Sequence, residues 1–154
     1  MQMTQLLEAD ALRVIGSATS KKRLFQTLGD MAQSVYGLSA NKVVDALQER
    51  ESLGPTGVGH GVALPHARLD ELDRVLGVFL KLDRPLDYGS VDKSPVDLVF
   101  ALFAPRDAGV NHLKALAFVS RTLRNPAICE QLRANHEPTK FIEILSTEAA
   151  TKAA

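Results

Sequence analysis

The chain has 154 residues, and its 18 Lys and Arg residues balance 18 Asp and Glu residues, so the formal net charge at pH 7 is zero. This length suits one domain with a sizeable core, and a hydrophobic share of 45% is too high for a disordered chain. Balanced charge argues against non-specific binding to nucleic acid or to an anionic membrane. The longest apolar run, Leu98 to Ala104, is far shorter than the ~20 residues of a membrane-spanning helix.

Three further features of the sequence define the class of protein. The single cysteine, Cys129, excludes an internal disulfide framework and a cysteine-based zinc finger. No basic segment followed by an apolar core stands at the N-terminus, so we expect no signal peptide and a cytoplasmic location. Without repeats or linkers, we expect one domain over residues 1–154, with its core at about 4–147 and a frayed tail at 149–154.

The first helical patterns lie between residues 20 and 54. One begins after Ser20, a suitable N-cap, carries an apolar stripe and ends at Gly37. A second is predicted after Ser39, running towards Arg50 and stopping by Gly54.

The last third of the chain is also predicted to be helical. Asn111 is interpreted as the N-cap of a helix that ends before Asn125-Pro126, and a short helix and another opened by Pro138 follow it. The predicted inward face of the first of these helices consists of Leu113, Leu116, Ala117, Ser120 and Leu123.

The middle of the chain has the composition of β-strands. Short apolar runs at Val62 to Leu64, Val75 to Leu82 and Val96 to Ala104 are bounded by Pro, Gly or Asp, and Ala11 to Ile15 is a further candidate. The near-continuous apolar character of the longer runs indicates strands covered on both faces. The sequence therefore predicts an α/β fold, a small mixed β-sheet flanked by helices in a single-domain sandwich.

A glycine-rich segment leads to a histidine in the middle of the chain. Four of the ten glycines lie between residues 54 and 61, and the short strand that follows ends at Pro65-His66. Because Pro65 has no N–H group, we expect the chain to leave the sheet there and expose His66. The glycines lack the Gly-Lys-Ser/Thr ending of a P-loop and do not follow a strand as in a dinucleotide-binding motif. From this pattern alone, a structural role for His66 is an equal alternative.

Two other residues strengthen the functional interpretation of His66. His112 lies in the first turn of a predicted helix, where free N–H groups and the helix dipole disfavour imidazolium and attract an anion such as phosphate. Arg50 precedes the glycines, and a guanidinium fork suits phosphate oxygens; Arg68 is a second candidate cation. The alternatives are a surface histidine at a helix start and a solvated arginine in the charged run 48–51.

Three motifs together resemble a known family. The run Gly54 to His66 resembles the phosphorylation motif of the fructose/mannitol-type enzyme IIA domains of the bacterial phosphoenolpyruvate-dependent phosphotransferase system. Pro95 to Pro105 resembles the central strand of that family, and Asn111-His112-Leu113 resembles its second-histidine motif. The resemblance extends from about Ser20 to Leu145. One departure is His60, where many relatives carry a small polar residue, often Asn.

The resemblance implies a mechanism and a set of partners. His66 would be the phosphorylated residue, at Nε2, with His112 as the second active-site histidine and Arg50 as the active-site arginine. The donor would be a phosphohistidine on an HPr-like phosphocarrier protein, without a cofactor or metal. As a stand-alone chain, the protein looks most like the nitrogen-regulatory branch of the family, whose targets include a potassium transporter or a sensor kinase. Neither nucleic acid nor membrane insertion is expected.

Three alternatives to a nitrogen-branch phosphocarrier stay open from the sequence. A sugar-specific, fructose/mannitol-type enzyme IIA would pass the phosphoryl group to an enzyme IIB for sugar uptake. A pure binding module would use phosphorylation of His66 only to switch partners. A third alternative is a metal site built from His60, His66 and His112.

Overall fold

The computed structural model describes residues 1–147, so the frayed tail predicted at 149–154 lies outside the described residues. The described chain contains five α-helices: α1 (Lys21–Tyr36), α2 (Ala40–Ser52), α3 (Val110–Leu123), α4 (Pro126–Ala134) and α5 (Pro138–Leu145). Its strands are β1 (Leu12–Ile15), β2 (Gly57–Gly59), β3 (Val62–Ala63), β4 (His66–Leu69), β5 (Leu76–Leu86) and β6 (Val96–Pro105). Two 3₁₀ turns, η1 (Met3–Gln5) and η2 (Ala9–Ala11), precede β1. None of the helices within 1–147 is long and apolar enough to cross a membrane.

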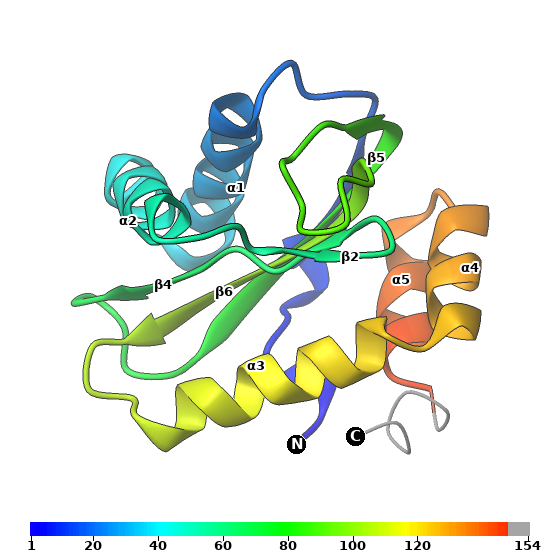
Figure 1. Cartoon of the computed structure of the whole chain (residues 1–154). Helices are drawn as coiled ribbons and strands as arrows, with labels where there is room; N and C mark the ends of the chain where they lie inside the picture. The colour runs from blue at the N-terminus through cyan, green and yellow to red at the C-terminus, as the bar shows by residue number, and fades with distance from the viewer. Residues whose placement is uncertain (148–154) are drawn as a thin grey trace.

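The six strands of this part of the chain form one mixed sheet in the order β1-β5-β6-β3-β2, and β4 also pairs with β6. The pairs β1/β5, β3/β6 and β4/β6 are parallel, whereas β2/β3 and β5/β6 are antiparallel. Helices α1 and α2 lie on one side of the sheet and α3 on the other, with α4 and α5 beside the hairpin end (Figure 1). This architecture confirms the predicted α/β class, a small mixed sheet flanked by helices.

The core is built around the two long central strands. Nine of the ten residues of β6 are buried, as are the first seven of β5, which confirms that these strands are covered on both faces. Phe79 of β5 contacts Phe100 of β6 and Phe141 of α5 edge-on, with ring centroids 6.3 and 5.3 Å apart. These aromatic contacts join the sheet to the C-terminal helix.

Local capping explains where most helices begin and end. The side chain of Ser20 accepts a hydrogen bond from the N–H of Arg23 at 3.1 Å, and Gly37 ends α1 in the left-handed conformation. Both boundaries of α1 were therefore predicted correctly. The predicted cap at Asn111 is wrong, because α3 starts at Val110 and Gly109 (φ 54°), two residues before Asn111, holds the cap position. His112 still lies in the first turn of α3.

The predicted inward face of α3 is wrong in part, because it contains the buried Leu123 but also the exposed Leu113. Leu113 is 62% exposed, whereas the buried residues are His112, Ala115, Phe118, Val119, Thr122 and Leu123. Two neighbouring stripes of α3 are apolar, and hydrophobic periodicity alone does not distinguish the stripe that packs on the sheet from the one that faces outward. The large side chain of Phe118 and the neighbouring Val119 lie inward, which turns Leu113 towards solvent.

The chain around Pro65 differs from the prediction. It does not leave the sheet: β3 and β4 pair in succession with the same strand, β6, and Pro65 lies at the break between them. The carbonyl of Pro65 accepts a hydrogen bond from the N–H of Leu102 at 3.0 Å, so the missing proline donor costs the sheet little. His66 then pairs with Leu102 and is half-buried instead of exposed. The strands β2 and β4 were not predicted.

Candidate active site

The centre of the site is a contact between α2 and β4. Arg50, in the last turn of α2, directs its Nε–H group at Nε2 of His66 across 3.3 Å. A second guanidinium nitrogen of Arg50 donates to the carbonyl of Gly54 at 3.0 Å, which fixes the guanidinium just beyond the end of the helix. Arg50 is therefore a half-buried residue of the site, and its interpretation as a solvated charge is wrong.

The other ring nitrogen of His66 is held by the backbone. Nδ1 lies 2.8 Å from the carbonyl oxygen of Leu64, and because a carbonyl only accepts, the proton is assigned to Nδ1. Nε2 is then unprotonated and carries the lone pair that faces Arg50. The Leu64-Pro65 break between two strands thus sets the tautomer of the histidine that follows it.

His112 lies beside His66. The two imidazole rings are 5.5 Å apart between centroids and meet edge to face at 72°. His112 is only 4% exposed, and within residues 1–147 its Nε2 is buried without a hydrogen-bond partner. An unpaired buried polar nitrogen is costly and needs an explanation. A ligand oxygen or a partner group arriving between the two rings would satisfy it.

The surroundings keep both imidazoles neutral. Burial lowers the pKa of His66, and the Arg50 guanidinium lowers it further, although the hydrogen bond to Leu64 acts in the opposite direction. Burial lowers the pKa of His112 to about 4, with smaller contributions from the charges of His66 and Arg68. At neutral pH the site therefore offers a nucleophilic nitrogen on His66 and fixed positive charge on Arg50.

The glycines and Arg68 contribute less directly to the candidate site than the sequence indicated. A Cβ atom at Gly57 would overlap Oγ of Ser90, and Gly61 forms the tight β2–β3 turn at φ 80°. These two glycines have packing and turn roles. Arg68 is exposed and donates to the carbonyl of Arg106 at 3.0 Å. Its contribution to the site is its positive charge near His112.

A buried carboxylate beside Arg50 was missed by the sequence analysis. The side chain of Glu51 is 8% exposed and forms an ion pair with Lys21 at 3.1 Å. It also accepts hydrogen bonds from the N–H of Thr56 at 2.9 Å, from the hydroxyl of Thr56, and from Tyr88 at 3.1 Å. Glu51 thus anchors the loop whose residue Gly54 holds Arg50. Nothing in the charged run 48–51 distinguishes this glutamate from its exposed neighbour Glu49.

His60, the departure from the family motif, is a turn residue. It occupies the β2–β3 turn with a positive φ of 57°, where Asn is favoured and His is tolerated. Its N–H group donates to Asp92 at 3.0 Å, and its carbonyl accepts from Arg133 at 2.7 Å. No group of three or more His, Cys, Asp or Glu side chains within residues 1–147 is arranged to hold a metal ion. His60, His66 and His112 therefore do not form such a group among these residues.

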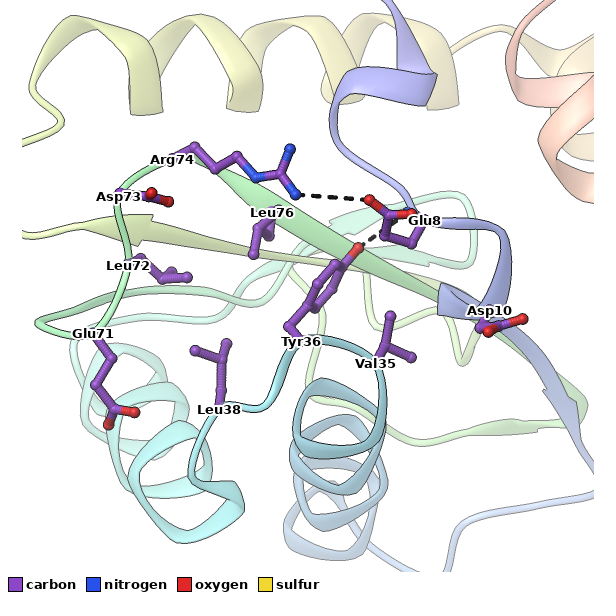
Figure 2. Close-up of a pocket in the computed structure, with 10 residues that line it drawn as sticks. All are labelled: Glu8, Asp10, Val35, Tyr36, Leu38, Glu71, Leu72, Asp73, Arg74 and Leu76. Atoms are coloured by element: carbon purple, nitrogen blue, oxygen red, sulfur yellow. Dashed lines mark hydrogen bonds and ion pairs between the residues drawn. The ribbon is translucent and has the colours of Figure 1, made fainter.

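A separate cavity of about 410 Å³ lies between the end of α1 and the β4–β5 loop (Figure 2). The hydroxyl of Tyr36 donates to the carbonyl of Gly77 at 2.7 Å and accepts from the N–H of Glu8 at 3.2 Å, and Arg74 pairs with the Glu8 carboxylate. Tyr36 therefore ties α1 to the N-terminal segment and to β5. The residues that line this cavity do not include Arg50, His66 or His112.

Comparison with known protein families shows the family to which the chain belongs. Residues 5–148 match the family described as "Phosphoenolpyruvate-dependent sugar phosphotransferase system, EIIA 2". The chain belongs to this family. The resemblance predicted from the sequence motifs is thereby confirmed.

Individual relatives point to one branch of the EIIA family. The chain is 42% identical over 153 residues to a nitrogen regulatory protein of Bradyrhizobium diazoefficiens, covering 99% of this chain and 100% of the relative. It is 34% identical over 152 residues to a nitrogen regulatory protein of Escherichia coli K12, covering 98% and 93%.

Solved structures agree with this assignment. The crystal structure of the nitrogen regulatory protein IIA-Ntr from Neisseria meningitidis matches with a TM-score of 0.86 and 30% identity, over 93% of this chain and 98% of that one. The Escherichia coli IIA mannitol structure matches with a TM-score of 0.75 over 90% and 97% of the two chains. Its 20% identity supports the fold alone.

Proposed function

We propose that this EIIA-family protein is a phosphocarrier that accepts a phosphoryl group on Nε2 of His66 and acts in nitrogen-related regulation in the cytoplasm. The observation that carries the proposal is the hydrogen bond of 2.8 Å between Nδ1 of His66 and the carbonyl of Leu64. It leaves Nε2 as the free nucleophile, opposite a guanidinium group. The donor is a phosphohistidine on an HPr-like carrier protein.

The transfer step balances without a cofactor. The lone pair of Nε2 attacks phosphorus, a new N–P bond forms on His66, and the N–P bond of the donor breaks. The donor imidazole leaves as a neutral ring with a proton on its other nitrogen, and the proton on Nδ1 of His66 stays hydrogen-bonded to Leu64. Alignment and charge stabilisation are the main requirements of phosphoryl transfer. Arg50 supplies the charge, and His112 supplies a hydrogen bond to a phosphoryl oxygen.

The surface around the two histidines suits a protein donor. Val110 and Leu113, in the same turn as His112, are 61% and 62% exposed, and Leu53 at the end of α2 is 81% exposed. Exposed apolar side chains gathered at a site are typical of protein contact surfaces. A phosphoryl group on His66 would add about 1.5 to 2 negative charges at this surface. Phosphorylation thereby changes which regulatory partner binds, and the relatives named as nitrogen regulatory proteins support such a role.

The deciding experiment is phosphorylation in vitro. The protein is incubated with phosphoenolpyruvate, the first enzyme of the system and the HPr-like carrier, then measured by intact mass before and after acid treatment. We expect one acid-labile phosphate on the wild type and none on His66→Ala. His136→Ala, which changes an exposed histidine, is the matched control and should be phosphorylated normally. One phosphate on folded His66→Ala would contradict the proposal. An enzyme IIB that removes the phosphate would favour the sugar-transport alternative.

A further inference from the structure

A second cavity, of about 560 Å³, opens between the β2–β3 hairpin and the junction of α3 with α4. Its apolar lining comes from Val58 of the hairpin, from Leu123 and Pro126 at the junction, and from Cys129 of α4. Arg124 and Glu130 also line it. Small-molecule sites are typically concave, mostly apolar cavities of 300–1,000 Å³ with a few placed polar groups, and this cavity fits that description.

Strong contacts hold the walls of the cavity in place. The guanidinium of Arg133 donates to both carboxylate oxygens of Asp97, at 2.9 and 3.0 Å, and to the carbonyl of His60 at 2.7 Å. Behind it, the ammonium group of the buried Lys81 donates to the carbonyls of Arg133 and Asn135 at 2.7 and 2.6 Å. These bonds fasten the hairpin and the end of α4 to the sheet. The cavity is therefore preformed, which lowers the cost of ordering a ligand site.

The charges at the cavity are distributed unevenly. Nε and Nη2 of Arg133 are engaged by Asp97 and His60. In contrast, the side chains of Arg124 and Glu130 are exposed and make no hydrogen bond or ion pair with any of the residues 1–147. The cavity thus presents one free cation and one free anion beside an apolar wall. A ligand of complementary chemistry carries a carboxylate, an ammonium group and an apolar body.

We propose that this cavity binds a free α-amino acid with a large apolar or aromatic side chain. Its carboxylate pairs with the guanidinium fork of Arg124, and its ammonium group pairs with Glu130. Its side chain packs against Val58, Leu123 and Cys129. The two walls are continuous with the segments that carry the site histidines, since the hairpin leads through β3 to His66 and α3 carries His112 in its first turn. The proposal is independent of phosphoryl transfer, because it uses none of the residues that would perform it.

Binding is tested on the unphosphorylated full-length protein by calorimetry and by amide chemical-shift mapping. The probes are L-phenylalanine and L-tryptophan, compared with 3-phenylpropanoate, which lacks the ammonium group, and 2-phenylethylamine, which lacks the carboxylate. We expect both amino acids to bind with Kd values below ~1 mM and to shift amides at 58–60 and 123–130, with either analogue at least ~10-fold weaker. Arg124→Gln and Glu130→Gln should each weaken binding ~10-fold, whereas Arg84→Gln, an exposed arginine on β5, should not.

Three results would overturn the proposal. One is the lack of any shift at ~10 mM amino acid, and another is a set of shifts outside the cavity. The third is equal binding of 3-phenylpropanoate and L-phenylalanine, which would make the cavity a simple carboxylate site. Because Arg124 and Glu130 are exposed, unchanged thermal unfolding of their variants separates lost binding from lost folding. None of these results bears on phosphorylation of His66, which is measured separately with the carrier.

Discussion

Arg50 and His66 face each other in the resting protein, with 3.3 Å between the guanidinium Nε and the imidazole Nε2. This contact exists because the carbonyl of Leu64 holds the opposite ring nitrogen at 2.8 Å. In the proposed reaction, Nε2 forms the new bond, so the Nε–H group of Arg50 must turn from the nitrogen to a phosphoryl oxygen. The same arginine then orients the nucleophile before transfer and neutralises charge during it.

Replacement of Arg50 tests this dual role. Arg50→Ala should fold normally and slow single-turnover phosphorylation of His66 about 100-fold, the usual cost of losing one charge-stabilising donor. Arg50→Lys should recover only part of the rate, since an ammonium group cannot bind Gly54 and the phosphoryl group as a planar fork does. Glu49→Ala, on the exposed side of α2, is the control. A wild-type rate in Arg50→Ala would remove Arg50 from the proposed site.

The exposed Leu113 should affect docking without affecting chemistry. Burial of one leucine contributes about 1.5–3 kcal/mol, so Leu113→Gln should raise the KM for the HPr-like carrier roughly 10- to 100-fold at an unchanged kcat. Stability should change by less than about 0.5 kcal/mol, because the side chain is 62% exposed. Val91→Gln removes an apolar side chain that is also exposed, at 78%, from the β5–β6 loop and should leave KM unchanged. Equal increases in KM for the two variants would show that the loss of any exposed apolar side chain weakens carrier binding, and that Leu113 is not a specific docking residue.

Glu51 should stabilise both the fold and the site. Burial alone would raise the pKa of Glu51, but its hydrogen bonds from Thr56 and its pairing with Lys21 outweigh burial and lower it. In Glu51→Gln the amide nitrogen cannot accept these bonds, so unfolding in urea should show a loss of about 1–3 kcal/mol. Glu49→Gln should stay within about 0.5 kcal/mol of the wild type. Equal stability of the two variants would show that the buried network contributes nothing.

The sequence predicted the elements that depend on local signals. Ser20 and Gly37 bound α1 as expected, because capping and left-handed glycine are properties of a few neighbouring residues. Features that depend on tertiary packing were wrong or missed. Burial of Leu113 was predicted wrongly, since two apolar stripes compete on α3, and Glu51 was missed, since its partners Thr56 and Tyr88 come from other segments. His66 and Arg50 were both candidate site residues, but their direct contact was not predicted, since it depends on how α2 packs against β4.

The buried histidine His112 predicts a pH dependence of stability. The pKa of His112 falls from 6.5 to about 4 in the folded protein. Between these two pH values the imidazole is protonated in the unfolded chain but neutral in the folded one. The free energy of unfolding should therefore decrease as the pH falls through this window, by roughly 1.4 kcal/mol per pH unit for one proton. His112→Gln should lose this part of the slope. Identical slopes for variant and wild type between pH 6 and 5 would contradict a neutral, buried His112.

His112 should also assist transfer without carrying the phosphate. Its Nε2 has no hydrogen-bond partner within residues 1–147, and its ring lies 5.5 Å from that of His66 between centroids. A neutral ring there can donate to a phosphoryl oxygen, and the hydrogen bond should be strongest while charge moves between donor and acceptor imidazoles. His112→Ala should still be phosphorylated on His66, but about 100-fold more slowly, and His112→Gln should recover part of the rate because an amide also donates. Single-turnover kinetics with the HPr-like carrier, followed by intact mass, measure both effects. If His112→Ala carries no phosphate and His66→Ala still does, then His112 is the phosphorylated residue and His66 the assisting one.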